Sequence, residues 1–214
     1  MQEKHNLTAN TLNIELKTYC RITNNTVSLN GKKIEINNSE NSSYLDAIYH
    51  TSDIHYLKFF KMDNLAKAGF LAAELIGNEL GWDRNECKKD HAVICFNRSS
   101  SLDDDMIYQQ TIQDKDNYFP SPSVFVYTLA NIVTGEIAIR NKIQGESSFY
   151  IIENFHPSVI YDTIVDAFQD DSINGILCGW VDYFENNCDV LMMYLQRKQD
   201  HSTVFTKEIL GEIY

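Results

Sequence analysis

Proline and glycine are scarce in this chain of 214 residues, which contains three Pro and nine Gly. So little turn-forming material leaves no room for long linkers or low-complexity arrays. Apolar residues make up 43% of the chain and charged residues 22%, a composition that can bury a hydrophobic core. One domain of ordinary size, or two very small ones, fits this length, and because no linker is visible we expect a single domain over 1–214.

Positive charge is scarce as well, with 18 Lys and Arg against 30 Asp and Glu and a net charge of −12. Such an acidic chain lacks the electrostatic footprint of a protein that binds nucleic acid or an anionic membrane. No apolar stretch approaches the roughly 18 residues that a membrane span needs. The first nine residues are polar and lack the apolar core of a secretory signal. We therefore expect a cytoplasmic protein without a nucleic-acid or membrane partner.

The cysteines show no pairing pattern. They are odd in number, widely spaced and never arranged as C-x-x-C, which indicates reduced thiols and neither a disulfide framework nor a zinc site. We expect no metal and no cofactor. The five are Cys20, Cys87, Cys95, Cys178 and Cys188.

Hydrophobic periodicity indicates strands that alternate with helices, which is typical of a layered α/β domain. The last two strands resemble a hairpin, so the sheet should be mixed. Asn30-Gly31 indicates a type I′ turn, and residues 98–105 are polar and predicted to be loop. Strands are predicted over 18–23, 92–96, 149–152, 176–183 and 190–195, a hairpin over 26–36, and helices over 63–80, 124–142 and 157–169.

The most informative segment runs from residue 131 to residue 179. Asn131 and Gly135 are the first and last residues of an Asn-x-x-x-Gly stretch. This stretch resembles part of the helix before the nucleophile in β-ketoacyl synthases, which have the thiolase fold. The family's spacing then places Gly145 at the next Gly, Asn154 at the nucleophilic Cys and Gly179 at the first Gly of a later strand, with no gap. One such match would be weak, but the linked series is fairly specific.

Two upstream segments support the same resemblance: residues 58–63 with 72–74, and the loop over 97–101. Together the similarity covers about residues 15–197, the N-terminal half of that fold. The resemblance therefore implies half of a thiolase-like fold, with a mixed sheet and helices on both faces.

The nucleophile position carries Asn154, whose amide cannot form the acyl thioester that a Cys thiolate forms. Asn suits a helix N-cap, so we expect Asn154 to keep the strand-to-helix elbow without its chemistry. The family's catalytic histidines lie in a C-terminal half that does not follow within this sequence. The resemblance thus implies a half-length pseudo-ketosynthase, as in bacterial clusters for aryl polyene and related polyketide pigments. It would act like a chain-length factor beside an active ketosynthase.

The predicted helix after Asn154 is amphipathic, so one side should meet water or a polar partner. Its apolar face is expected to contain Val159, Ile160, Ile164, Val165 and Phe168, and its polar face Asp162, Asp166 and Gln169. In the family the preceding strand pairs antiparallel across a two-fold axis. Here that strand includes Phe149, Tyr150, Ile151 and Ile152, and a free apolar edge would favour aggregation. We therefore expect it to pair with a ketosynthase or with a second copy.

Several residues allow a second interpretation. His156 could act as a general base, but a role in the first helical turn is favoured because no Ser or Cys is spaced to use it. Cys95 and Cys178 are expected to be buried structural thiols, and Gly145 to turn the chain into the interface strand. Three carboxylates over 99–105 could hold a cation, although they lack calcium-loop spacing. Trp180 and Tyr183 are expected in the core or at an interface.

Three functional hypotheses follow. The first is a non-catalytic ketosynthase subunit that assists acyl-chain elongation and influences chain length. The second is a decarboxylase of malonyl thioesters, in which Asn154 would hold an enolate oxygen. The third is a homodimer that binds an acyl chain. Acyl carrier proteins are usually acidic, so a carrier should dock mainly on the partner of this acidic chain.

Overall fold

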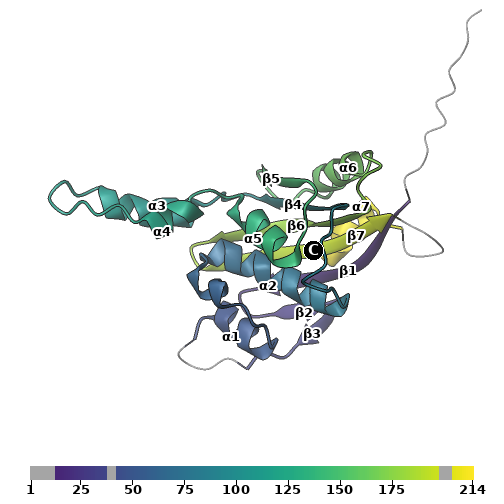
Figure 1. The fold of residues 1–214 in the computed structure, drawn as a ribbon, viewed down its shortest axis with the longest axis horizontal. Coiled ribbons are helices and arrows are strands. Elements are labelled where there is room, and N and C mark those ends of the chain that lie inside the picture. The colour runs from purple at the N-terminus through teal and green to yellow at the C-terminus, as the bar shows by residue number, and fades with distance from the viewer. Residues whose placement is uncertain (1–12, 38–41, 198–203) are drawn as a thin grey trace, which may run out of the picture.

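The computed structural model describes residues 13–37, 42–197 and 204–214. Its strands form one seven-stranded sheet in the order β3-β2-β1-β7-β6-β4-β5 (Figure 1). The elements are β1 (Ile14–Thr23), β2 (Val27–Leu29), β3 (Lys32–Ile34), α1 (Tyr44–Thr51), η1 (Leu57–Lys61), α2 (Asn64–Glu79), β4 (His91–Asn97), α3 (Leu102–Ile112), α4 (Pro122–Tyr127), α5 (Ile132–Asn141), β5 (Ser147–Ile151), α6 (Pro157–Ala167), β6 (Gly175–Phe184), β7 (Asn187–Arg197) and α7 (Lys207–Ile213).

The sheet is mixed, as its last two strands predicted. β4 runs parallel to both β5 and β6, whereas β7 runs antiparallel to β6 and to β1. The β2–β3 hairpin turns at Asn30 and Gly31, whose φ angles of 51° and 74° are both positive, as a type I′ turn requires.

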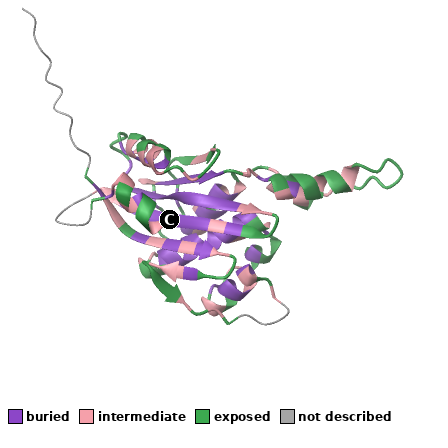
Figure 2. Cartoon of the chain, turned by 180° about the vertical axis from the view of Figure 1, so that it is seen from behind, coloured by how far each residue is buried: buried purple, intermediate pink, exposed green. Residues whose placement is uncertain are grey.

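Helices cover both faces of the sheet, and side-chain alternation along the strands decides which face each residue joins. On β4, Val93 and Cys95 join the core under α1, α2 and α5, whereas Ile94 and Phe96 join the core under α6 and α7. Figure 2 shows the second face, with buried strands beneath α6 and α7. The predicted α/β class with helices on both faces is confirmed.

Helix α2 is the central helix of the first face and is buried along most of its length. Its N-cap is Asp63, whose carboxylate accepts hydrogen bonds from the N–H groups of Leu65 and Ala66 at 3.0 and 3.1 Å. Gly69 lets α5 and the sheet approach closely, because a Cβ atom there would collide with Val133. The helix lies where the sequence predicts it, within two residues at each end.

Two predicted boundaries are wrong around residues 98–142. The expected loop over 98–105 ends early, because α3 begins at Leu102. The first turn of α3 holds Asp103, Asp104 and Asp105, whose negative charges interact favourably with the positive end of the helix dipole. The expected helix over 124–142 is two helices, α4 and α5. The side-chain hydroxyl of Thr128 bonds the carbonyl of Phe125 at 2.7 Å, which competes with helix continuation. Residues 102–129 form a helical hairpin, here called the arm, that projects from the body (Figure 1).

Candidate functional site

Asn154 occupies the exposed turn between β5 and α6. It does not cap the helix, so that prediction is wrong. The N-cap is His156, whose Nδ1 accepts the N–H of Val159 at 3.4 Å, because α6 starts with Pro157 two residues later than an Asn154 cap would require. This geometry leaves the Asn154 amide in solvent. His156 caps the first turn of α6, which is the structural role favoured for it over that of a general base.

The residue after Asn154 is fixed by an aromatic stack. The Phe155 ring lies 3.7 Å from the Tyr214 ring, nearly parallel to it, and meets Trp180 edge-on at 6.0 Å. Asp189 accepts hydrogen bonds from the indole of Trp180 and the hydroxyl of Tyr214, and pairs with Arg21 at 2.6 Å. These rings fill the space between the elbow and the sheet. Trp180 is a core residue, 3% exposed.

The predicted apolar face of α6 needs one correction. Ile160, Ile164 and Phe168 are buried, and Val165 packs against them, but Val159 is 42% exposed. Val159 lies in the first turn of α6. The polar face of Asp162, Asp166 and Gln169 is exposed, as the amphipathic pattern predicted.

Gly135, Gly145 and Gly179 are the landmark glycines of the family spacing. Close packing requires a glycine at two of these positions. A Cβ on Gly145 would collide with the carbonyl oxygen of His91, and one on Gly179 would collide with the backbone of Leu191 on β7. Gly135 differs, because nothing lies within 4 Å of the position its Cβ would take. Asn131 caps α5 without a side-chain bond. The roles assigned to these residues by the resemblance remain proposals.

The thiols in the core of the sheet are buried and protonated. Cys95 and Cys178 lie fully buried on β4 and β6. Burial raises the pKa of the Cys95 thiol to about 12 and raises that of Cys178 well above its usual value. Both therefore stay protonated at neutral pH, and a protonated buried thiol is a poor nucleophile. Within the described residues, all five cysteines are free and Cys87 is the exposed one.

β5 forms one edge of the sheet and pairs with β4 alone. Tyr150 and Ile151 are 40% and 58% exposed, whereas Phe149 is half-buried against the core. Ile152 follows the end of the strand and donates its N–H to the carbonyl of Asn97 at 2.8 Å. The outer edge of β5 is thus an apolar strand edge open to pairing.

Helix α5 extends this open edge. The hydroxyl of Ser147 on β5 donates to the hydroxyl of Thr134 on α5 at 2.9 Å, so the two elements are neighbours. Gly135 and Ile139 lie one turn apart on α5, and Ile139 is 60% exposed. An unfilled glycine position and an exposed Ile give this face the shape and polarity of a helix-packing surface.

The loop after β4 is organised by the carboxylate of Asp182 from β6. It accepts the N–H groups of Arg98 and Ser99 at 3.3 and 3.0 Å and the hydroxyl of Ser99 at 3.3 Å. Ser101 then donates its hydroxyl to the carbonyl of Thr128 at 2.6 Å, which joins the two helices of the arm at their base. The Asn97–Ser101 segment is therefore a structural joint between β4 and the arm.

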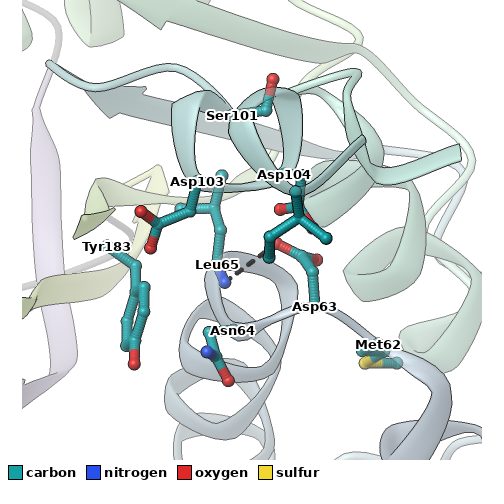
Figure 3. A pocket seen from close by; sticks show the side chains of 9 residues that line it. Met62, Asp63, Asn64, Leu65, Ser101, Asp103, Asp104 and Tyr183 are labelled. Atoms are coloured by element: carbon teal, nitrogen blue, oxygen red, sulfur yellow. Dashed lines mark hydrogen bonds between the residues drawn. The ribbon is translucent and has the colours of Figure 1, made fainter. Parts of the chain in front are cut away.

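Two carboxyl groups meet beside this joint (Figure 3). Asp63 at the start of α2 and Asp104 on α3 share a hydrogen bond, which requires a proton on one of them. Burial, followed by the charge of Asp63, raises the pKa of Asp104 to about 8, and burial also raises the pKa of Asp63. Asp104 is 8% exposed. The pair lines a cavity of about 240 Å³ that also contacts Asp103 and Tyr183.

Further charges surround this pair. Glu136 on α5 is buried, accepts the hydroxyl of Tyr127 at 3.4 Å and pairs with Lys58 at 2.7 Å. Burial and the charge of Glu136 raise the pKa of Tyr127. Sequence reasoning missed this cluster, because its members come from five elements, η1, α2, α3, α4 and α5, and no spacing rule connects them.

Two neighbouring cavities lie on the side of the sheet covered by α2. The cavity beside Asp104 and its neighbour of about 280 Å³, lined by Tyr44, Asn64 and Cys188 among others, do not include Asn154. Among the described residues, no group of three His, Cys, Asp or Glu side chains is arranged to hold a metal. No helix in the part of the chain that the structure describes has the length and apolarity needed to cross a bilayer.

No family model matches the sequence, and no curated protein matches it at a significant level. The fold, however, is that of ketosynthase and chain length factor structures, which is the thiolase-like architecture. The ishigamide ketosynthase/chain length factor aligns with a TM-score of 0.63 and 9% identity, over 88% of this chain and 63% of that chain.

Two further structures give the same result. The ketosynthase ApeO in complex with its chain length factor ApeC, from Xenorhabdus doucetiae, aligns with a TM-score of 0.56 and 9% identity, over 87% of this chain and 80% of that chain. The AntDE:AntF complex, a type II polyketide synthase acyl-carrier protein with its ketosynthase, gives 0.57 and 10% identity, over 87% and 63%. This chain thus spans less than two thirds of the first and third of these. The thiolase-like fold that the resemblance implied is confirmed.

Proposed function

We propose that this chain is a non-catalytic, chain-length-factor-like subunit that pairs with an active ketosynthase and assists acyl-chain elongation in a polyketide or fatty-acid-type pathway. The proposal rests on Asn154, which the family spacing places at the nucleophile position. Its carboxamide is not a nucleophile, and the next residue, Phe155, is stacked on Tyr214.

The open edge supports the pairing part of this proposal. Tyr150 and Ile151 on β5 and Ile139 on α5 would leave water if a partner strand added to the sheet. Burying such side chains contributes roughly 1.5–3 kcal/mol each. Main-chain hydrogen bonds along β5 would give the pairing its register.

The catalytic part is tested with malonyl thioesters. The purified chain should neither condense nor decarboxylate them, whereas its mixture with the partner ketosynthase should exceed the activity of either protein alone. Asn154→Ala should leave the activity of the complex unchanged, because the amide takes no part in the chemistry. Turnover by the chain alone that Asn154→Ala abolishes would favour the decarboxylase instead.

The pairing part is tested by light scattering after size exclusion. Co-expression with the ketosynthase should give a 1:1 complex that Ile151→Lys weakens, because a buried lysine at the strand edge is costly. Val159→Lys is the matched control, since Val159 is also exposed but lies on α6. A stable homodimer indifferent to the ketosynthase would contradict the heterodimer and favour a homodimer that binds an acyl chain.

A further inference from the structure

The arm carries an unusual share of the exposed apolar surface. Of the sixteen large apolar side chains exposed in the described residues, eight lie within residues 102–129. An apolar concentration of this kind on a projecting element marks an interaction site. The eight are Leu102, Met106, Ile107, Tyr118, Phe119, Phe125, Val126 and Leu129.

The arm cannot cover these side chains by itself. It is a hairpin of two short helices, of 11 and six residues, and helices of this length gain little stability without packing. Tyr108 and Phe125 meet at 5.2 Å between ring centroids, yet Phe125 remains 53% exposed. Figure 2 shows the arm extending away from the body with most of its surface exposed. Its apolar residues therefore need a surface supplied from outside the described fold.

The charge of the arm identifies what that surface must be. The arm contains five Asp and one Lys, and Asp105, Asp114 and Asp116 are exposed beside the apolar residues. A second copy of this arm would be repelled, and the whole chain carries a net charge of −12. An anionic membrane would be repelled for the same reason. The complementary surface is apolar and bordered by Lys or Arg.

We propose that the arm docks in an apolar groove with a basic rim on the ketosynthase subunit. The identity of that partner rests on the function proposed above. Tyr118 and Phe119, 58% and 74% exposed at the tip, fill the groove, as aromatic anchors do at other interfaces. Asp114 and Asp116, which precede these two residues in sequence, pair with the rim and set the orientation.

Photo-crosslinking in the native cells tests the arm and the edge strand separately. The photoreactive amino acid p-benzoylphenylalanine replaces Phe119, Tyr150 or, as an exposed control on the hairpin of the body, Lys33. The crosslinked peptides are identified by mass spectrometry. We expect Phe119 to reach a ketosynthase peptide next to Lys or Arg, Tyr150 to reach a different ketosynthase segment, and Lys33 to reach neither.

The outcomes separate this inference from the proposed function. Crosslinks to a ketosynthase from Tyr150 but not from Phe119 would overturn the docking role of the arm and leave the proposed function intact. Crosslinks from Phe119 to a second copy, to a carrier protein or to nothing would also overturn it. If neither position reached a ketosynthase, both proposals would fail.

Charge reversal gives a quantitative test with the crosslinked ketosynthase after purification. Asp116→Lys should weaken its binding roughly tenfold, and the loss should shrink at high ionic strength. Asp171→Lys makes the same charge change at an exposed carboxylate on the body and should change binding little. Equal effects of the two substitutions would mean that net charge alone, not the arm, governs association.

Discussion

Replacing Asp104 by Asn should change how stability depends on pH. In the folded protein the pKa of Asp104 is raised from its ordinary value of 3.8 to about 8, first by burial and then by the charges of Asp63, Asp103 and Asp105. Between these two pH values the folded chain holds a proton that the unfolded chain has released. Stability therefore falls as pH rises through this range, and the loss is complete above the folded pKa.

The magnitude follows from the shift and from the surroundings of the pair. One pKa unit corresponds to about 1.4 kcal/mol, so the full shift would be worth roughly 6 kcal/mol. The adjacent cavity of about 240 Å³ admits water, which screens the two carboxylates, and Asp63 shares the proton. We therefore expect a loss of about 2 kcal/mol in the free energy of unfolding between pH 5 and pH 8.5.

Asp104→Asn removes the titration and keeps a donor for the Asp63 carboxylate at every pH. Relative to the natural chain, the variant should gain about 2 kcal/mol on going from pH 5 to pH 8.5, measured by urea denaturation at each pH. Asp105→Asn is the control, because Asp105 lies in the same helical turn but is exposed. If the Asp104→Asn curve ran parallel to that of the natural chain, the shared proton would be refuted.

Three further substitutions test the packing. Gly179→Ala should lower the free energy of unfolding by at least about 3 kcal/mol, because its Cβ would collide with the backbone of Leu191; a change under about 1 kcal/mol would contradict this packing. Gly135→Ala should instead stabilise the isolated chain by about 0.5–1 kcal/mol in a thermal melt, since its Cβ meets open space, and a loss would show an unseen contact. Glu74→Gln should cost about 3 kcal/mol in urea denaturation, because Glu74 is 1% exposed and holds Arg84 and Arg140; a cost near zero would mean that water already compensates both arginines.

Periodicity was sufficient to predict the core elements of the sheet. The apolar run of β4 and the alternation around Asn30-Gly31 each have one structural solution, because a strand buried on both faces and a two-residue hairpin turn leave few alternatives. The same reasoning failed for α3, whose polar sequence has no apolar stripe to report a helix. It failed again at Thr128, where a local side-chain bond divides a continuous apolar pattern into α4 and α5.

The site was predictable only where the chain itself sets the geometry. The family spacing singles out Gly145 and Gly179, and the structure shows that a Cβ at either position would collide with the backbone. The meeting of Asp63 with Asp104 depends on the docking of the arm against α2, which no local pattern encodes. The cap at His156 instead of Asn154 depends on the single residue Pro157, whose fixed φ places the first helical turn.

The three landmark glycines separate what folding requires from what a partner would require. Gly145 and Gly179 have no room for a side chain inside this chain, so the fold alone explains them. Gly135 has room, and a glycine inside a helix costs about 0.5–1 kcal/mol relative to Ala, so folding of the isolated chain opposes it. Its surroundings, exposed Ile139 and the free edge of β5, are those of an unfilled contact. If a partner helix packs there, Gly135→Ala should stabilise the isolated chain and weaken the complex, a reversal that a purely internal role for Gly135 would not produce.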